Sequence, residues 1–279
     1  MVHMEYSITP PRGLLAINWP ELWRFRDLFL TLAWRDISVR YKQAVLGVLW
    51  ALLQPISTML IFTFIFNRMA NIQSGDGTPY PLFFYTGMII WQYYSSTLSN
   101  ASNSMVANVS LIQKVYFPRL IVPATAATTG LVDLAISSLV LFGLMAWYGF
   151  MPHFTGILIL PVLLIVMMLS ALGVGLFMAA LNIKYRDVRY ALPFVIQILM
   201  YLTPVIYPVR MLDKWPIAKA LMVWLNPISA VITNARAGLL GQSAFDPTGL
   251  AIASLMSIVM FIVGLYYFRN TERHFADIA

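Results

Sequence analysis

Six stretches of the sequence are long and apolar enough to cross a membrane as helices. A spanning helix needs about 20 mostly apolar residues to cross about 30 Å of hydrocarbon. The second stretch turns polar in its later half, and the fifth contains three prolines, which predict a kinked or broken helix. The pattern predicts an all-α integral membrane protein with six transmembrane helices. They are Val45–Phe66, Leu82–Ser104, Ile121–Tyr148, Ile157–Leu181, Ala191–Val209 and Leu250–Phe268.

Residues 20–42 show a different, amphipathic pattern. On a helix, five apolar side chains fall on one side, while Leu30 and Trp34 interrupt the polar side formed by Arg24, Thr31 and Arg35. A basic, aromatic-rich helix suits the headgroup layer of a membrane, so we expect an N-terminal amphipathic interfacial helix. A juxtamembrane segment that only sets the topology is the alternative. The apolar side consists of Leu22, Phe25, Phe29, Leu32 and Ala33.

Two short helices are predicted within residues 210–248, before the last span. Ile217–Leu225 and Ile228–Leu240 are helical in pattern; Asn226-Pro227 separates them, and Gly241 ends the second. The longer of the two covers only about 20 Å, which is too short to cross a membrane. We therefore expect a pair of re-entrant outer helices that cap or gate an exit.

Charge and composition convert this pattern into a topology. The chain is 60% hydrophobic and 10% charged, contains no cysteine and has a formal charge of +7. This composition excludes a disordered chain, a disulfide scaffold and an ordinary cytosolic globule. Because basic loops stay inside, both termini are expected to be cytoplasmic, and the charge does not indicate nucleic-acid binding. Thirteen lysines and arginines then lie in inner segments, and five lie outside: Arg68, Arg210, Lys214, Lys219 and Arg236.

The expected organisation has three parts. Residues 1–44 form a cytoplasmic N-terminus with the interfacial helix, residues 45–268 a transmembrane domain, and residues 269–279 a cytoplasmic tail. The domain contains a cytosolic loop at 105–120 and the outer gate helices at 210–248.

The loop 105–120 carries signals for a short helix. Ser110-Leu111-Ile112-Gln113 fits a capping box, and Pro118 discourages helix at the residue before it. Exposed apolar side chains in a cytosolic loop predict a docking site for another subunit, and an interfacial helix on lipid is the alternative. The side chains expected to be exposed are Leu111, Ile112, Val115, Tyr116 and Phe117.

No catalytic or nucleotide-binding pattern is present. The sequence has no Walker A motif, no G-x-S-x-G elbow and no H-E-x-x-H motif. Its three histidines and eleven acidic residues are too scattered for a rich metal site. We therefore expect a non-enzymatic chain with no cofactor of its own, which takes its energy from a partner ATPase.

Polar groups at membrane depth are few. The run 95–104 is rich in hydroxyl and amide groups, which are costly against lipid; we expect partial exposure to a cavity, with helix packing as the alternative. Asp133 lies about twelve residues into the third span, and no cation is expected at the same depth to pair with it. A hydrogen-bonded or neutral aspartate facing the bundle interior is expected, and proton coupling at Asp133 is the alternative.

Several motifs occur together along the chain, from about residue 22 to 269. They are Arg35-Asp36-Ile37-Ser38-Val39-Arg40-Tyr41-Lys42-Gln43, Leu46-Gly47-Val48-Leu49-Trp50, Leu53-Gln54-Pro55, Lys114-Val115-Tyr116-Phe117-Pro118-Arg119, Asn182-Ile183-Lys184-Tyr185-Arg186-Asp187-Val188-Arg189-Tyr190, Leu202-Thr203-Pro204-Val205-Ile206-Tyr207-Pro208 and Leu225-Asn226-Pro227. Together these motifs resemble one family, the type-2 ATP-binding-cassette permeases that export polysaccharides and polyol phosphates.

The resemblance implies a homodimer that works with two copies of a separate ATP-binding subunit, which holds ATP and Mg. It further implies export of a glycan carried on undecaprenyl pyrophosphate across the bacterial inner membrane. O-antigen is the cargo of the members most similar to this chain, and capsule and teichoic acid are cargoes of others.

The resemblance also assigns roles to residues. The loop matching 110–119 would be the coupling helix in a cleft of the ATPase, and the loop 182–190 a second contact. These two loops supply Leu111, Ile112, Lys114, Val115, Tyr116, Phe117, Arg119, Tyr185, Arg186 and Asp187. The stretch 20–47 would form the interfacial helix and the gate through which substrate enters, with Arg35, Arg40, Tyr41, Lys42, Leu46 and Gly47.

The pore would form between two copies, mostly from the first and fifth spans. Aromatic side chains are candidates for its lining because sugar C–H faces stack on rings, although membrane aromatics more often serve in belts or in packing. Two rival functions stay open on the sequence alone: an ion-coupled flippase of lipid-linked glycans, and a membrane glycosyl or acyl transferase. The candidate lining residues are Phe62, Phe66, Trp91, Tyr201 and Tyr207.

Overall fold

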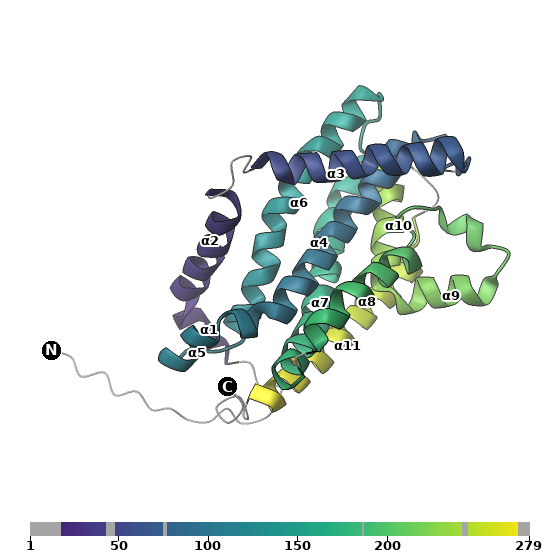
Figure 1. The fold of residues 1–279 in the computed structure, drawn as a ribbon. Helices are drawn as coiled ribbons and strands as arrows, with labels where there is room; N and C mark the ends of the chain where they lie inside the picture. The colour runs from purple at the N-terminus through teal and green to yellow at the C-terminus, as the bar shows by residue number, and fades with distance from the viewer. Residues whose placement is uncertain (1–17, 43–47, 75–76, 186, 242–244, 273–279) are drawn as a thin grey trace.

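The computed structural model describes residues 18–42, 48–74, 77–185, 187–241 and 245–272, and every regular element in these ranges is a helix (Figure 1). Leu46, Gly47 and Arg186 of the predicted sites lie outside the described residues. The helices are α1 (Trp19–Arg24), α2 (Arg26–Lys42), α3 (Val48–Phe62), the π-helix η1 (Thr63–Met69), α4 (Tyr80–Ala107), α5 (Val109–Lys114), α6 (Ile121–Trp147), α7 (Phe154–Lys184), α8 (Val188–Leu202), the 3₁₀-helix η2 (Val209–Leu212), α9 (Pro216–Leu225), α10 (Pro227–Leu240) and α11 (Pro247–Glu272).

The centre of the molecule is a bundle of α4, α6, α7 and α11, with α10 packed against three of them at one end. α4 is the most enclosed helix: Leu82, Phe84 and Tyr85 are fully buried in the main hydrophobic core. Figure 1 shows α2 running beside α6, and α3 crossing over the bundle in this view.

The enclosure of α4 explains how its polar second half is accommodated. Thr97, Ser102 and Ser104 are buried among the helices, and the Ser104 hydroxyl donates to the carbonyl of Ala101 at 2.7 Å. The Nδ2 atom of Asn182 on α7 donates to the Ser102 carbonyl and to Oδ1 of Asn103, both at 3.1 Å. The buried half of this run therefore serves helix packing, and the cavity exposure expected from the sequence is limited to its half-buried and exposed members.

Within the described ranges, four helical stretches are long and apolar enough to cross a membrane: α6, most of α7, α11, and residues 52–69, which run from α3 into η1. The pair α9 and α10 counts as a fifth if it is one broken span, because the two helices meet at 92°. α8 has only 15 residues, since it ends at Leu202 before the proline-containing segment 203–208. The chain is thus a multi-pass membrane protein, and the six-span count stays a prediction.

The break between α9 and α10 lies where the sequence predicts it. Asn226 accepts a hydrogen bond on Oδ1 from the Ile228 amide at 3.1 Å, and its Nδ2 donates to Thr203 Oγ1 at 2.7 Å. Pro227 takes the first helical position, where its missing N–H costs nothing. Gly241 ends α10 in the left-handed conformation at φ 65°.

Glycines allow the closest helix contacts. α7 and α11 form the most extensive helix pair, and Gly173 and Gly264 lie where they cross. A Cβ atom at residue 264 would overlap the carbonyl oxygen of Gly173, so a larger residue would force the helices apart. Small residues at such crossings are typical of membrane helices, which lack a hydrophobic force to bring them together.

Candidate functional site: one end of the helix bundle

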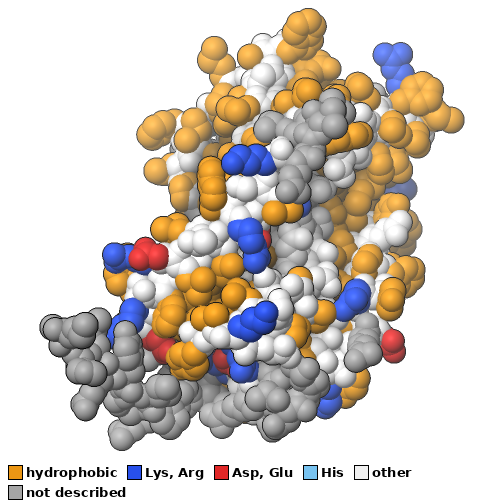
Figure 2. Space-filling model, turned by 60° about the vertical axis from the view of Figure 1, so that its left-hand side comes forward, with side chains coloured by type: hydrophobic (Ala, Val, Ile, Leu, Met, Phe, Trp, Pro, Cys, Tyr) orange, Lys and Arg blue, Asp and Glu red, His pale blue; other side chains and the backbone are white. Residues whose placement is uncertain are grey.

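The segments that the sequence assigns to one side of the membrane gather at one end of the bundle (Figure 1). The Tyr116 hydroxyl lies 3.4 Å from Oε1 of Glu21, which joins the loop after α5 to α1. Arg119 Nη1 donates to the carbonyl of Glu272 at 2.7 Å, which joins the same loop to the end of α11. In the face shown in Figure 2, most charged side chains lie in the lower half and hydrophobic ones dominate the upper part.

α5 is the short helix expected in the loop between α4 and α6, but its start was predicted wrongly. Ser110 lies inside α5, and Asn108 is the capping residue, because its backbone carbonyl accepts from the amides of Leu111 and Ile112, both at 3.1 Å. Asn108 also accepts from Arg35: the Arg35 Nη2 atom lies 3.0 Å from Asn108 Oδ1. The start of α5 is therefore tied to α2.

The loop after α5 has an exposed tip and a buried anchor. Val115 and Tyr116 are exposed by 50% and 65%, whereas Phe117 is only 4% exposed. The expected exposure of Phe117 is therefore wrong: extended backbone at Val115 lets side chains alternate, and Phe117 turns into a second core cluster with Met105 and Phe268. The remaining members of the predicted contact are half-buried or exposed: Leu111, Ile112, Lys114 and Arg119.

The second predicted contact, between α7 and α8, lies at the same end of the bundle (Figure 1). Tyr185 is 51% exposed, and the Lys184 ammonium lies 5.2 Å from the centre of its ring. Asp187 is exposed and precedes the first residue of α8, where its carbonyl accepts from Tyr190 and Ala191, both at 3.0 Å. Both loops thus carry an exposed aromatic side chain at the same end of the bundle.

The amphipathic pattern of residues 20–42 is confirmed in its burial but not as one straight helix. Leu32 and Ala33 are buried, while Leu30 and Trp34 are exposed by 61% and 67%. The helix is divided at Phe25 into α1 and α2, and the buried side of α2 packs on α6. The remaining apolar residues of the predicted face, Leu22, Phe25 and Phe29, are half-buried.

Asp133 has a cation as its partner, contrary to the sequence-based expectation. Arg40 Nη1 donates to Asp133 Oδ2, and the Tyr41 hydroxyl donates to Asp133 Oδ1. Burial, together with this hydrogen bond, raises the pKa of Tyr41, so its hydroxyl keeps the proton that it donates. The sequence missed this pair because α2 was expected to lie flat in the headgroup layer, whereas it runs along α6 and brings its last turn to the middle of that helix (Figure 1).

The other charged residues of α2 are less enclosed. Arg35 donates from Nη2 to Asp36 Oδ1 at 2.7 Å, in addition to its bond with Asn108. Lys42 is exposed at the end of α2. The basic residues predicted for the substrate gate therefore point to three surroundings: Arg35 to α5, Arg40 to α6 and Lys42 to the surface.

The candidate lining aromatics differ in their surroundings, and four of the five, Phe62, Phe66, Trp91 and Tyr207, belong to the main core or pack against it. Phe62 stacks on Phe66 at 5.4 Å between ring centres, while the Tyr207 hydroxyl donates to the Tyr201 carbonyl at 2.9 Å. Trp91 is 4% exposed inside the main core, so in this conformation its ring offers no open face to a substrate.

Arg236 is a buried structural arginine, although the sequence pattern places it among the charges of the outer loops. It lies within α10 and is 4% exposed. Its Nε donates to the Phe83 carbonyl at 3.0 Å, and Nη1 and Nη2 donate at 2.7 Å to the carbonyls of Pro204 and Val205. The guanidinium also lies 3.5 Å from the centre of the Phe83 ring. The prolines that break α8 leave carbonyls without helical donors. This signal could have predicted a buried side-chain donor such as Arg236 beside them.

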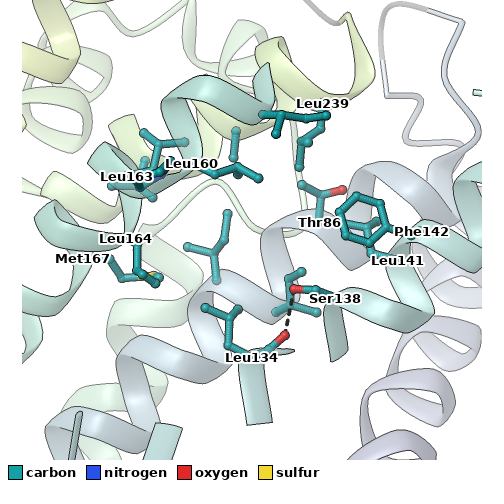
Figure 3. A pocket seen from close by; sticks show the side chains of 16 residues that line it. Thr86, Leu134, Ser138, Leu141, Phe142, Leu160, Leu163, Leu164, Met167 and Leu239 are labelled. Carbon is teal, nitrogen blue, oxygen red and sulfur yellow. Dashed lines mark hydrogen bonds between the residues drawn. The ribbon is translucent and has the colours of Figure 1, made fainter. Parts of the chain in front are cut away.

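A cavity of about 360 Å³ opens between α4, α6, α7 and α10 (Figure 3). Its walls are almost entirely apolar, with Leu160, Leu163 and Met167 on one side. The hydroxyls of Thr86 and Ser138 donate to carbonyls of their own helices at 2.8 and 2.7 Å. The cavity therefore suits hydrocarbon and offers little to a sugar.

A bundle of long apolar helices defines an all-α integral membrane protein, and no group of metal-ligating residues occurs in the described ranges. The sequence profile of the ABC-2 type transporter family matches residues 27–240, so the chain belongs to this family.

Similar proteins cover nearly the whole chain. An O-antigen export system permease protein RfbA of Klebsiella pneumoniae is 27% identical over 252 residues, which are 90% of this chain and 95% of that protein. The RfbA permease of Myxococcus xanthus is 25% identical over 92% of this chain and 97% of its own length. The polysialic acid transport protein KpsM of Escherichia coli is 23% identical over 85% and 91%, respectively.

Proposed function

We propose that the chain is the permease subunit of an ATP-driven exporter that moves a lipid-linked polysaccharide, of the O-antigen type, across the bacterial inner membrane. Membership in the ABC-2 family supports ATP-driven transport. The cargo rests on end-to-end similarity to O-antigen export permeases.

The observation that carries this proposal is the loop after α5. Val115 and Tyr116 are exposed at its tip, while Phe117 anchors it in the core formed by α4, α6, α7 and α11. A rigidly held, apolar tip can transmit force from a docked subunit to the long helices. In this proposal two copies of the chain work with two ATP-binding subunits, which hold ATP and Mg and carry out hydrolysis.

The proposed orientation has the end with α1, α5 and the last turn of α11 in the cytoplasm, together with both termini. Thirteen basic residues belong to the segments on this side, and removing Arg236 from the outer loops leaves four on the other. The correction of Arg236 therefore strengthens the charge asymmetry.

The proposed substrate is a glycan on undecaprenyl pyrophosphate. Its headgroup approaches from the inner leaflet past α2, where Arg35, Arg40 and Lys42 attract phosphate. The glycan then passes between the two copies of the chain, with Phe62, Phe66, Tyr201 and Tyr207 as stacking surfaces.

The test is co-purification of the ATP-binding subunit with a tagged permease, combined with an export assay in cells. The double variant Val115→Asp/Tyr116→Asp should lose both the partner and export, because charged groups replace the apolar tip without entering the core. Met151→Asp is the matched control, since Met151 is 86% exposed in the loop at the other end of α6. Unchanged co-purification of the double variant would overturn the coupling role.

A second cargo within the same family is supported by the similarity to the polysialic acid transporter. Deleting the gene and analysing surface glycans separates the two: loss of O-antigen supports the first, and loss of capsule the second. An ion-coupled flippase, the rival function, requires transport in proteoliposomes that depends on an ion gradient and not on ATP.

A further inference from the structure

The last turn of α2 holds two hydrogen-bond donors that converge on one carboxylate. Arg40 donates to one oxygen of Asp133, and Tyr41 donates to the other. Two consecutive residues of α2 therefore bind one carboxylate on α6. The pair is reachable from outside: 40% of the Arg40 side chain and 22% of the Asp133 side chain are exposed.

These donors match a phosphate as well as they match a carboxylate. A guanidinium binds both groups through charge-assisted hydrogen bonds in a planar fork, and a phenolic hydroxyl adds a further donor. A pyrophosphate carries more negative charge and more acceptor oxygens than Asp133. The arrangement is therefore an anion site whose present occupant belongs to the protein itself.

Exchange of this occupant is physically reasonable because the ion pair is partly exposed. Displacement exchanges one charge-assisted hydrogen bond of Arg40 for another, so Arg40 does not lose a partner when a competing anion replaces Asp133. The opposite holds for Arg236, which is enclosed and bonded to backbone carbonyls that cannot leave.

Arg35, five residues before Arg40 on α2, connects the same helix to the start of α5. Arg35 donates to Asn108, the residue that begins α5, at 3.0 Å. α2 therefore has polar contacts at two points, one at the start of α5 and one on α6, in addition to the apolar packing of its buried side on α6. Release of Arg40 and Tyr41 from Asp133 would loosen the last turn of α2, which leads toward α3, while its link to α5 and its apolar packing remain.

We propose that Arg40 and Tyr41 bind the pyrophosphate of the incoming polyprenyl lipid, and that Asp133 is a stand-in anion that occupies their site until the substrate displaces it. This inference rests on the proposed function for the identity of the substrate. It assigns Asp133 a role in positioning α2 and in setting the affinity for the headgroup.

The test measures binding of undecaprenyl pyrophosphate to the complete transporter, permease with ATP-binding subunit, in nanodiscs of neutral lipid. Asp133→Asn removes the competing charge and should tighten binding by about tenfold, since an internal competitor lowers apparent affinity. Arg40→Gln should weaken binding by about tenfold or more, because it removes the charge-assisted bonds. Arg26→Gln is the matched control: the same change on the same helix, at an exposed side chain, should leave binding unchanged.

Three further ligands identify the source of the anion. Undecaprenol should show no difference between the variants, because it lacks phosphate. Inorganic pyrophosphate and vesicles containing phosphatidylglycerol serve as competitors; a site for the lipid-linked headgroup should be displaced by the first and much less by the second. Displacement by phosphatidylglycerol at equal strength would identify a general lipid site and overturn the proposal.

Equal or weaker binding by Asp133→Asn would show that Asp133 only anchors α2. This result would overturn the inference and would not affect the proposed function of the chain in export. Tyr41→Phe keeps the ring and removes one donor, so it provides a second test if Arg40→Gln does not fold; unchanged binding by Tyr41→Phe would count against the site. If the unaltered transporter neither binds undecaprenyl pyrophosphate nor exports a glycan, the proposed function itself fails.

Discussion

Arg40 and Arg236 are two arginines whose side chains bond to neighbouring helices or segments, and they are held in different ways. Arg236 bonds to three backbone carbonyls and lies over the Phe83 ring, with 4% of the residue exposed. Arg40 bonds to a side-chain carboxylate, and 40% of its own side chain is exposed.

Arg236 and the three carbonyls that it binds form a permanent clasp, whereas the bond between Arg40 and Asp133 can be exchanged. Backbone carbonyls stay where the helices are, so the bonds of Arg236 last as long as the fold and join α4, the broken end of α8 and α10. A side-chain carboxylate can rotate away, so the bond of Arg40 can open without unfolding α2 or α6. The comparison teaches that two arginines of one protein can differ in kind: Arg236 stabilises the fold through partners that cannot leave, whereas Arg40 has a partner that can be exchanged.

Replacement of Arg236 should have the largest effect on stability. Arg236→Met retains an apolar stem and removes the guanidinium. The buried carbonyls of Pro204 and Val205, which lie outside regular helix, then lose their donor, and each such group costs about 1–3 kcal/mol. We expect a fall in thermal stability by several kcal/mol and poor recovery of folded protein. The measurement is fluorescence-detected gel filtration after heating in detergent.

Arg236→Lys tests the geometry, because an ammonium keeps the charge and lacks the planar fork. It should recover only part of the lost stability. An unchanged melting temperature for Arg236→Met would show that the clasp is dispensable.

Gly87→Ala should have the next largest effect. A Cβ at residue 87 would lie 2.5 Å from Nη2 of Arg236 and 3.3 Å from the Val205 carbonyl, so the clasp would have to shift. Overpacking of this kind costs about 1–3 kcal/mol. Thermal unfolding in nanodiscs measures the change.

The matched control is Gly143→Ala on α6, where a Cβ would meet nothing within 4 Å. Alanine favours helix over glycine by about 1 kcal/mol, so this variant should be as stable as the unaltered chain or slightly more so. Equal destabilisation by both substitutions would mean that the contact with Arg236 is not the cause.

The sequence predicts the helices of this fold well because their ends depend on local signals. The third span was expected at Ile121–Tyr148, and α6 covers Ile121–Trp147. The break at Asn226-Pro227 is a local proline effect, and the structure has it at that position. Apolar length and proline placement need no knowledge of distant residues.

The contacts that define the sites depend on packing and were missed for that reason. Arg40 and Asp133 are 93 residues apart, and they meet only because α2 lies along α6. Phe117 is buried although it lies in a loop, because three long helices end beside it. A residue pattern gives the direction of a side chain on its own helix, and it does not say which helix lies opposite.

The smallest effect on stability is expected at Arg40. Arg40→Gln removes one partly exposed ion pair and leaves the Tyr41 hydrogen bond to Asp133 in place, so the melting temperature should change far less than for Arg236→Met. Export of the glycan should nevertheless fall strongly, because the proposed headgroup site loses its charge. The measurement pairs thermal unfolding with an export assay on the same variant.

The exchanged pair Arg40→Asp/Asp133→Arg restores an ion pair between α2 and α6 but removes the cation from α2. If this double variant exports normally, attraction between the helices is all that Arg40 supplies. If it is stable and inactive, the position of the cation on α2 is what the transporter requires, and the contrast with Arg236 holds.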